Sequence, residues 1–114
     1  MPEIDLIENE KIIKKFKGDF WNNTFLFLYE QQGGEIILTN LRIVFISKVF
    51  NIKKVTAQIM YQDIENIENC NVGTVIPLNP TGIKINIKNG QSCKLSSYHR
   101  GKIMDLINQM IMQN

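Results

Sequence analysis

The stretch Gly34–Lys48, with the sequence GEIILTNLRIVFISK, constrains the fold of this chain more than any other. Two runs rich in β-branched residues, Ile36–Leu38 and Ile43–Ile46, flank the polar residues Thr39–Arg42. Such a pattern predicts two buried strands that are joined by a very tight turn. We therefore expect an antiparallel pair of strands at the centre of the fold.

The length and composition indicate one globular domain over residues 1–114, in which residues 1–9 form a polar lead-in. Hydrophobic residues make up 44% of the chain and charged residues 21%, as in an ordinary soluble protein. The formal net charge is only +2. This value does not indicate nucleic-acid binding, which needs a concentrated basic face or a strongly basic domain.

The chain shows no targeting signal. Residues 1–10 are acidic and lack the apolar core of a secretory signal, and no apolar run approaches the roughly 18 residues of a membrane span. Cys70 and Cys93 have no partners at metal-ligand spacing, so we expect small buried or half-buried thiols in a reducing compartment. We expect a cytoplasmic protein, able to attach peripherally to a membrane, without metal or cofactor.

The first third of the chain is ambiguous. Lys11–Lys17 fits either a half-exposed edge strand or a short helix, and we favour the strand. Gly18–Asn23 is predicted to be a turn. Thr24–Tyr29 is apolar on both faces, which is typical of a strand covered on both sides. Glu30–Gly34 predicts a hairpin loop into the central pair.

Alternation is clearer in the second half. Apolar residues alternate with polar ones in three predicted strands, at Val55, Ala57, Ile59 and Tyr61, at Ile83, Ile85 and Ile87, and at Cys93 and Leu95. The outward positions of the last strand are Ser92, Lys94 and Ser96. Residues 69–80 are predicted to be a loop, after a segment that Ile64 and Ile67 anchor. Asn89-Gly90 is a strong hairpin signal, because both positions of a type I′ turn need positive φ.

The carboxyl end changes to a helical period. Over residues 99–112 the apolar positions are Ile103, Leu106, Ile107, Met110 and Ile111, the spacing of one helical face. Ser96 or Ser97 could cap this helix. Several antiparallel strands with one amphipathic helix predict a sandwich or open barrel that the helix closes.

Several segments resemble the GRAM/pleckstrin-homology-like family in order and spacing. They are Asn9–Lys11, the Thr39-Asn40-x-Arg42 corner, Met60–Ile67, and the Asn89-Gly90 hairpin before the helix. The resemblance implies a mainly β fold, a seven-stranded antiparallel sandwich or barrel capped by a C-terminal α-helix. It also implies that Arg42 fixes the corner. One strand is then too many, so either Lys11–Lys17 or Thr24–Tyr29 is not an independent strand.

No constellation for catalysis is visible in the sequence. The single histidine, His99, stands at the helix entry, where a surface or capping role fits it. Asp63, Glu65 and Glu68 fit a solvated rim better than an acid–base pair. No glycine-rich loop with phosphate-binding spacing precedes a helix. We expect a protein that is not an enzyme.

A basic segment is the leading binding candidate. In a predicted exposed loop, 48–54, Lys48, Lys53 and Lys54 could attract anionic lipid headgroups at roughly 1 kcal/mol each, and Phe50 could insert. In pleckstrin-homology-like domains this loop borders the open end where headgroups are often held. The alternative is that Phe50 and Ile52 fold back onto the core.

A second basic surface would consist of Lys84, Lys88 and Lys94, although outward lysines can simply protect a sheet from association. The facing of Lys14, Lys15 and Lys17 is not fixed by the sequence. The predicted first hairpin loop, Glu30–Gly34, offers no cation, which argues against stereospecific headgroup recognition.

We expect a non-enzymatic binding module that attaches peripherally to anionic membrane lipids. The alternative is a protein- or peptide-interaction module on the same scaffold. We expect no nucleic-acid partner, and a homodimer formed through unpaired strand edges is left open. Salt distinguishes the two functions, because electrostatic lipid binding weakens steeply with ionic strength.

Overall fold

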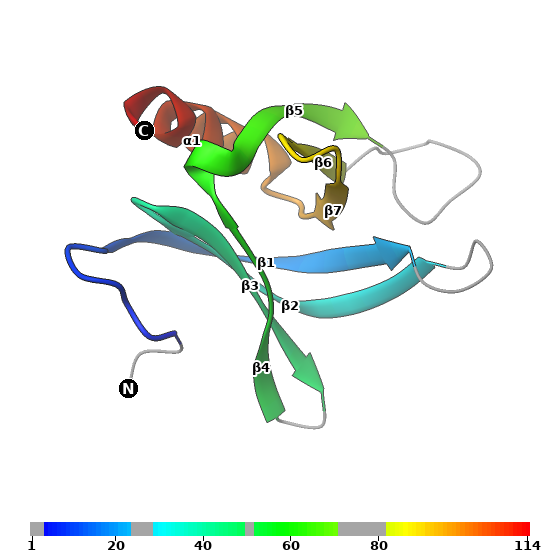
Figure 1. Ribbon diagram of the computed structural model, residues 1–114. Helices are drawn as coiled ribbons and strands as arrows, with labels where there is room; N and C mark the ends of the chain where they lie inside the picture. The colour runs from blue at the N-terminus through cyan, green and yellow to red at the C-terminus, as the bar shows by residue number, and fades with distance from the viewer. Residues whose placement is uncertain (1–3, 24–28, 50–51, 71–81) are drawn as a thin grey trace.

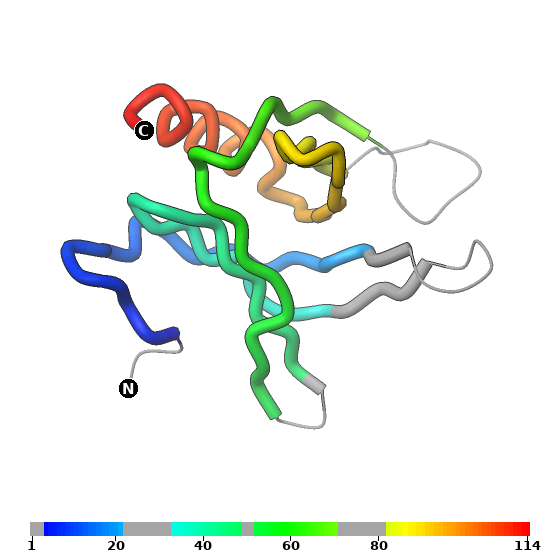
Figure 2. Tube along the Cα trace, in the orientation of Figure 1, coloured from blue at the N-terminus to red at the C-terminus, as the bar shows by residue number. Residues whose placement is uncertain are grey.

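The computed structural model describes residues 4–23, 29–49, 52–70 and 82–114 (Figures 1 and 2). Within these ranges the strands are β1 (Ile12–Asn23), β2 (Tyr29–Thr39), β3 (Arg42–Val49), β4 (Ile52–Met60), β5 (Ile64–Cys70), β6 (Gly82–Ile87) and β7 (Ser92–Ser96). A short 3-10 turn, η2 (Tyr61–Asp63), links β4 to β5, and the helix α1 (Arg100–Gln113) follows β7. In the described part of the chain, no helix is long and apolar enough to cross a membrane.

The seven strands form one antiparallel sheet in the order β4-β3-β2-β1-β7-β6-β5. β1 belongs to both halves, since it pairs with β2 along its length and with β7 only over Asp19–Trp21. The sheet folds over at this strand, and Figure 1 shows α1 beside β5 and β6. This confirms the expected seven-stranded antiparallel architecture with one C-terminal helix.

Two glycines allow neighbouring strands to approach closely. Gly18 of β1 and Gly34 of β2 lie directly opposite each other. A Cβ on Gly18 would lie 2.6 Å from the carbonyl oxygen of Ser96, and one on Gly34 would lie 1.8 Å from that of Ile46. No side chain fits at either position, because neighbouring backbone already occupies the space.

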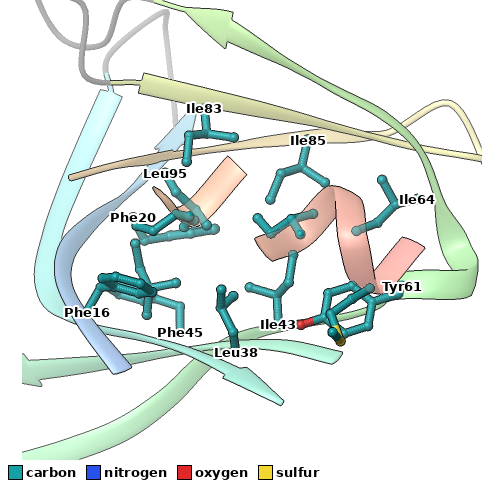
Figure 3. Close-up of a cluster of buried hydrophobic side chains, with 14 residues drawn as sticks. Phe16, Phe20, Leu38, Ile43, Phe45, Tyr61, Ile64, Ile83, Ile85 and Leu95 are labelled. Carbon is teal, nitrogen blue, oxygen red and sulfur yellow. The ribbon is translucent and has the colours of Figure 1, made fainter. Parts of the chain in front are cut away.

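The main core lies between the two halves of the sheet and α1. Figure 3 shows side chains from both halves pointing toward one another, among them Phe16, Phe45, Ile83 and Leu95. From the helix, Ile103, Ile107 and Met110 are buried, three of the five positions on the predicted apolar face. Each fully buried aliphatic side chain contributes about 2 kcal/mol by removal from water.

The first third of the chain differs from the sequence prediction. Lys11–Lys17 is a strand as favoured, since β1 begins at Ile12. The turn predicted at Gly18–Asn23 is wrong, because these residues continue β1, and the loop predicted at Glu30–Gly34 is wrong, because they lie in β2. The glycines mark close packing inside strands rather than chain reversals. Thr24–Tyr29 is not an independent strand, since Tyr29 begins β2 and residues 24–28 lie outside the described residues.

The later hairpin and the helix start also differ in detail. Gly90 has φ of +92°, but among described non-glycine residues only Asn9 has positive φ, so the predicted type I′ turn is wrong. A longer connection joins β6 to β7, and Asn89 Oδ1 accepts a hydrogen bond from the Gln91 amide at 2.9 Å. Neither predicted serine caps α1. Ser96 faces outward as predicted but is buried, its Oγ accepting from Trp21 Nε1, while Ser97 Oγ accepts from the His99 amide, before the helix. The predicted loop 69–80 begins later, since β5 reaches Cys70, and residues 71–80 lie outside the described residues.

Candidate functional site

The polar corner between β2 and β3 is a structural network. Arg42 is buried, and its Nε lies 2.8 Å from Glu10 Oε2. The Thr39 hydroxyl also lies 2.7 Å from Glu10 Oε2, and it accepts hydrogen bonds from the Leu41 and Arg42 amides. Tyr61 donates from its hydroxyl to the carbonyl of Thr39 at 2.7 Å. The interpretation of Arg42 as the residue that fixes this corner is confirmed, so it is not a free cation.

The same network holds the amino-terminal segment against the sheet. Burial by itself raises the pKa of Glu10, but hydrogen bonds from Arg42, the Ile7 amide and Thr39 outweigh it and lower the pKa to about 2. Arg42 Nη2 also donates to the carbonyl of Asp5 at 2.7 Å. Although residues 1–9 are predicted to be a polar lead-in, Ile4 is buried. It covers a second apolar cluster, which consists of Ile37, Val44 and Ile46.

The lysine-bearing segment after β3 is mostly strand rather than loop. β3 extends to Val49 and β4 starts at Ile52, so the loop predicted over 48–54 is wrong in its extent. Lys48 lies opposite Lys53, and Ser47 lies opposite Lys54, within the β3–β4 ladder. Phe50, the predicted insertion residue, lies outside the described residues. The paired part of the β3–β4 hairpin is therefore longer than the sequence predicts, since pairing reaches Val49 and Ile52.

The end of the β3–β4 hairpin projects away from the rest of the domain. The first four residues of β4, Ile52–Val55, are all exposed, which means that both faces of the strand meet solvent. Figure 1 shows the β3–β4 hairpin extending away from the other strands. Ile52 is 69% exposed, so the alternative in which it folds back onto the core is wrong.

The charges at this hairpin are largely of one sign. Lys48 and Lys53 face each other directly across the pair, an arrangement that is unfavourable for two like charges. Lys53 Nζ lies 4.0 Å from Glu35 Oε1 of β2. No sequence signal marks Glu35 as part of the site, because its approach to Lys53 depends on the register of three strands. Ile52 does carry a signal, as an aliphatic residue between lysines.

The second predicted basic surface is more nearly neutral. Lys84 and Lys94 lie opposite each other on β6 and β7, and both are half-buried. Lys84 Nζ lies 3.8 Å from Glu68 Oε1, and its neighbour across β5–β6 is the same glutamate. Lys88 is not on the strand face, because β6 ends at Ile87. The structure therefore brings Lys84 and Lys94 together and places Glu68 beside Lys84.

The remaining reactive side chains are not activated. Burial raises the pKa of the Cys70 thiol, and nearby Lys94 and Lys84 oppose that effect only in part. Burial raises the pKa of Cys93 to about 12, so both thiols stay protonated at neutral pH. His99 packs its ring 5.7 Å from that of Phe16. Within the described ranges, no three acidic, histidine or cysteine side chains gather as a metal site.

Comparisons with known proteins agree with the fold described above. The sequence profile of the GRAM domain family matches residues 2–112. No curated protein matches the chain in sequence.

Solved structures share the fold at low sequence identity. The C-terminal domain of an unknown protein from Leishmania infantum aligns with a TM-score of 0.71 and 12% identity, covering 92% of this chain and 87% of that one. The linker-DH/PH domains of p115-RhoGEF align with a TM-score of 0.70 and 9% identity, covering 95% of this chain and 31% of that one. The Slm1-PH domain aligns with a TM-score of 0.62 and 12% identity, covering 88% and 97%. At these identities the likeness concerns the fold.

Proposed function

This chain belongs to the GRAM domain family, and on that premise we propose that it attaches peripherally to anionic lipid surfaces through the end of the β3–β4 hairpin. GRAM and pleckstrin-homology-like domains are lipid- or protein-binding modules and are generally non-catalytic. In the proposed contact, Lys48, Lys53 and Lys54 attract lipid phosphates. Phe50 and Ile52 insert into the membrane interface beside these lysines.

The observation that carries this proposal is the exposure of Ile52 among lysines on a projecting hairpin. A 69% exposed isoleucine contributes little to the fold, and its transfer into a bilayer interface would contribute about 1 to 2 kcal/mol. Lysines near a charged membrane add about 1 kcal/mol each. Together these terms support reversible attachment that depends on both charge and an inserted side chain.

A structural neighbour adds support from outside the chain. The Slm1-PH domain has been crystallised in complex with phosphoserine. That ligand carries a phosphate, the same chemical group that lysines on this hairpin would contact at a lipid surface.

Co-sedimentation with liposomes tests the proposal. Neutral, phosphatidylserine-containing and phosphoinositide-containing vesicles are compared at low and physiological ionic strength. We expect binding to the anionic vesicles that weakens with salt, because exposed charges are screened. The variant Phe50→Ser/Lys53→Glu/Lys54→Glu should lose this binding while its melting temperature stays near that of the wild type.

The matched control changes the net charge by the same amount at positions outside the hairpin. Lys88→Glu/Lys102→Glu replaces two exposed lysines outside the hairpin and should retain most binding. Absence of binding by the wild-type protein would refute the proposal. Equal loss in the control and the hairpin variant would show that only overall charge matters.

A second candidate function rests on the open edges of the sheet. β4 and β5 are the terminal strands in the sheet order, so each has one edge without a strand partner in the described part of the chain. Such an edge can accept an extended peptide by strand addition. A DH/PH fragment of PDZRhoGEF, another structural neighbour, has been crystallised with RhoA. Peptide binding of this kind would respond to salt much less than lipid binding does.

A further inference from the structure

The pairing register gathers lysines from three strands on one face of the β1–β4 half. Residues directly opposite across an antiparallel pair project to the same face, as do residues two apart along a strand. Glu35 of β2 lies opposite Lys17 of β1 and opposite Ile46 of β3. Two residues after Ile46, Lys48 lies opposite Lys53 of β4. All these side chains therefore share one face.

This is the outer face of the sheet. Lys15 lies opposite Ile37, two residues before Lys17, and so projects to the same side. Ile37 and Ile46 belong to the cluster beneath Ile4 and not to the main core. The outer lysine face is defined here as Lys15, Lys17, Lys48 and Lys53, all of which are exposed.

The register also places the adjacent residues Lys53 and Lys54 on opposite faces of the hairpin. Lys54 lies opposite Ser47 and therefore projects to the other face of the hairpin than Lys53 does. An end-on contact through the hairpin tip would use Lys53 and Lys54 alike. A contact through the outer face would use Lys53 with Lys15 and Lys17, and would leave Lys54 on the far side.

The Glu35 carboxylate lies among these lysines. Glu35 contacts Lys53 at 4.0 Å and lies directly opposite Lys17. Asp19 of β1, two residues after Lys17, projects to the same side and lies opposite Gly33 of β2 and Ser96 of β7. Four strand lysines therefore share this face with Glu35, and the Glu35 carboxylate competes with any external anion for Lys53.

We propose that the outer lysine face, and not only the end of the hairpin, lies against the anionic bilayer, and that Glu35 sets how much negative charge the bilayer must carry. This inference rests on the proposed function. The strands β1 and β4 are three strand spacings apart, about 14 Å, so the lysines are spread over a surface much wider than one phosphate group. A bilayer offers many phosphates over a broad surface, which matches lysines spread across a sheet.

The test compares single lysine-to-glutamine variants in co-sedimentation with phosphatidylcholine/phosphatidylserine vesicles. Lys53→Gln and Lys54→Gln make the same change in adjacent residues on opposite faces. We expect Lys53→Gln to weaken vesicle affinity about fivefold and Lys54→Gln to weaken it less. Lys15→Gln/Lys17→Gln should weaken affinity about twentyfold, and Lys88→Gln, an exposed lysine of the other half, is the control.

Glu35→Gln gives a change of opposite sign. Removal of this carboxylate should raise vesicle affinity about fivefold and lower the fraction of phosphatidylserine needed for half-maximal binding. A loss of binding through misfolding cannot imitate an increase, so this variant protects the test from unfolding artefacts.

The outcomes separate the two proposals. If Lys53→Gln and Lys54→Gln weaken binding equally while the Lys15/Lys17 variant binds like the wild type, the contact is end-on and this inference fails, but the proposed function stands. An unchanged affinity in Glu35→Gln would refute the role given to that residue. If the wild-type protein binds no vesicle, the proposed function fails and this inference fails with it.

Discussion

The two ends of β3 place a positively charged side chain in opposite environments. At its start, the guanidinium of Arg42 is buried and meets the Glu10 carboxylate, the Asp5 carbonyl and the Gln58 side chain. Near its other end, Lys48 is exposed and faces a second lysine, Lys53. The charge of Arg42 is paired inside the protein, whereas the charge of Lys48 lies at the surface, where an external anion can reach it. The strand therefore shows that partners and burial, not residue type, decide whether a cation holds the fold or can bind a ligand.

The largest expected effect tests the buried end. Arg42→Met should lower the free energy of unfolding by about 3 to 5 kcal/mol, because Glu10 is left as a buried charge without its cation. Lys48→Met makes a similar change at the exposed end and should stay within about 0.5 kcal/mol of the wild type. Urea unfolding of both variants measures the difference. Comparable losses in the two variants would remove the contrast between the ends of β3.

The next effect concerns the end of the β2–β3 pairing, where Gly34 lies opposite Ser47. Gly34→Ala places a Cβ against the Ile46 carbonyl and should destabilise the protein by about 3 kcal/mol through overpacking. Gly33→Ala is the matched control, because its nearest described contact, Asp19 Oδ1 at 3.3 Å, is the end of a side chain that can move. Thermal melts of the pair measure the difference. Similar melting temperatures would show that β2 and β3 separate easily at this point.

Acid sharpens the comparison further. The folded pKa of Glu10 is about 2, below its ordinary value of 4.5, so the unfolded chain takes up this proton at a higher pH than the folded chain does. The stabilisation is present above pH 4.5 and declines as the pH falls toward 2. Urea unfolding across this window should therefore show a steeper loss in the wild type than in Glu10→Gln. Parallel pH profiles would contradict the assigned role of Glu10.

The smallest expected effect on stability is at the hairpin end. Ile52→Ser should change the free energy of unfolding by less than about 0.5 kcal/mol, because the side chain is already 69% exposed. The same change should reduce vesicle association in the liposome assay. A clear fall in melting temperature would instead place Ile52 among the residues that hold the fold.

Sequence pattern predicts those parts of the molecule that local periodicity controls. The alternation at Ile83 and Ile85 and the helical spacing at Ile103 and Ile107 both correspond to buried positions. The glycine at position 18 is misleading, because a residue that usually ends a strand here allows two strands to approach. Local sequence could not reveal this, since the clash is with residues far along the chain.

The candidate site is less predictable than the fold, and the reason is register. The lysines Lys48, Lys53 and Lys54 can be chosen from the sequence, but which of them share a face cannot. Glu35 joins them only because β2, β3 and β4 align in one way. A shift of one residue in either pair would place it on the opposite face.

The double pairing of β1 has a consequence for the order of folding. β2 follows β1 closely in sequence, whereas the Trp21–Ser96 hydrogen bond joins positions 75 residues apart. During synthesis β1 to β4 can therefore pair as soon as they emerge, while the second edge of β1 waits for almost the whole chain. Until β7 arrives, that edge presents unpaired backbone groups to other nascent chains. Closure through so distant a contact is expected to be the slow step of folding.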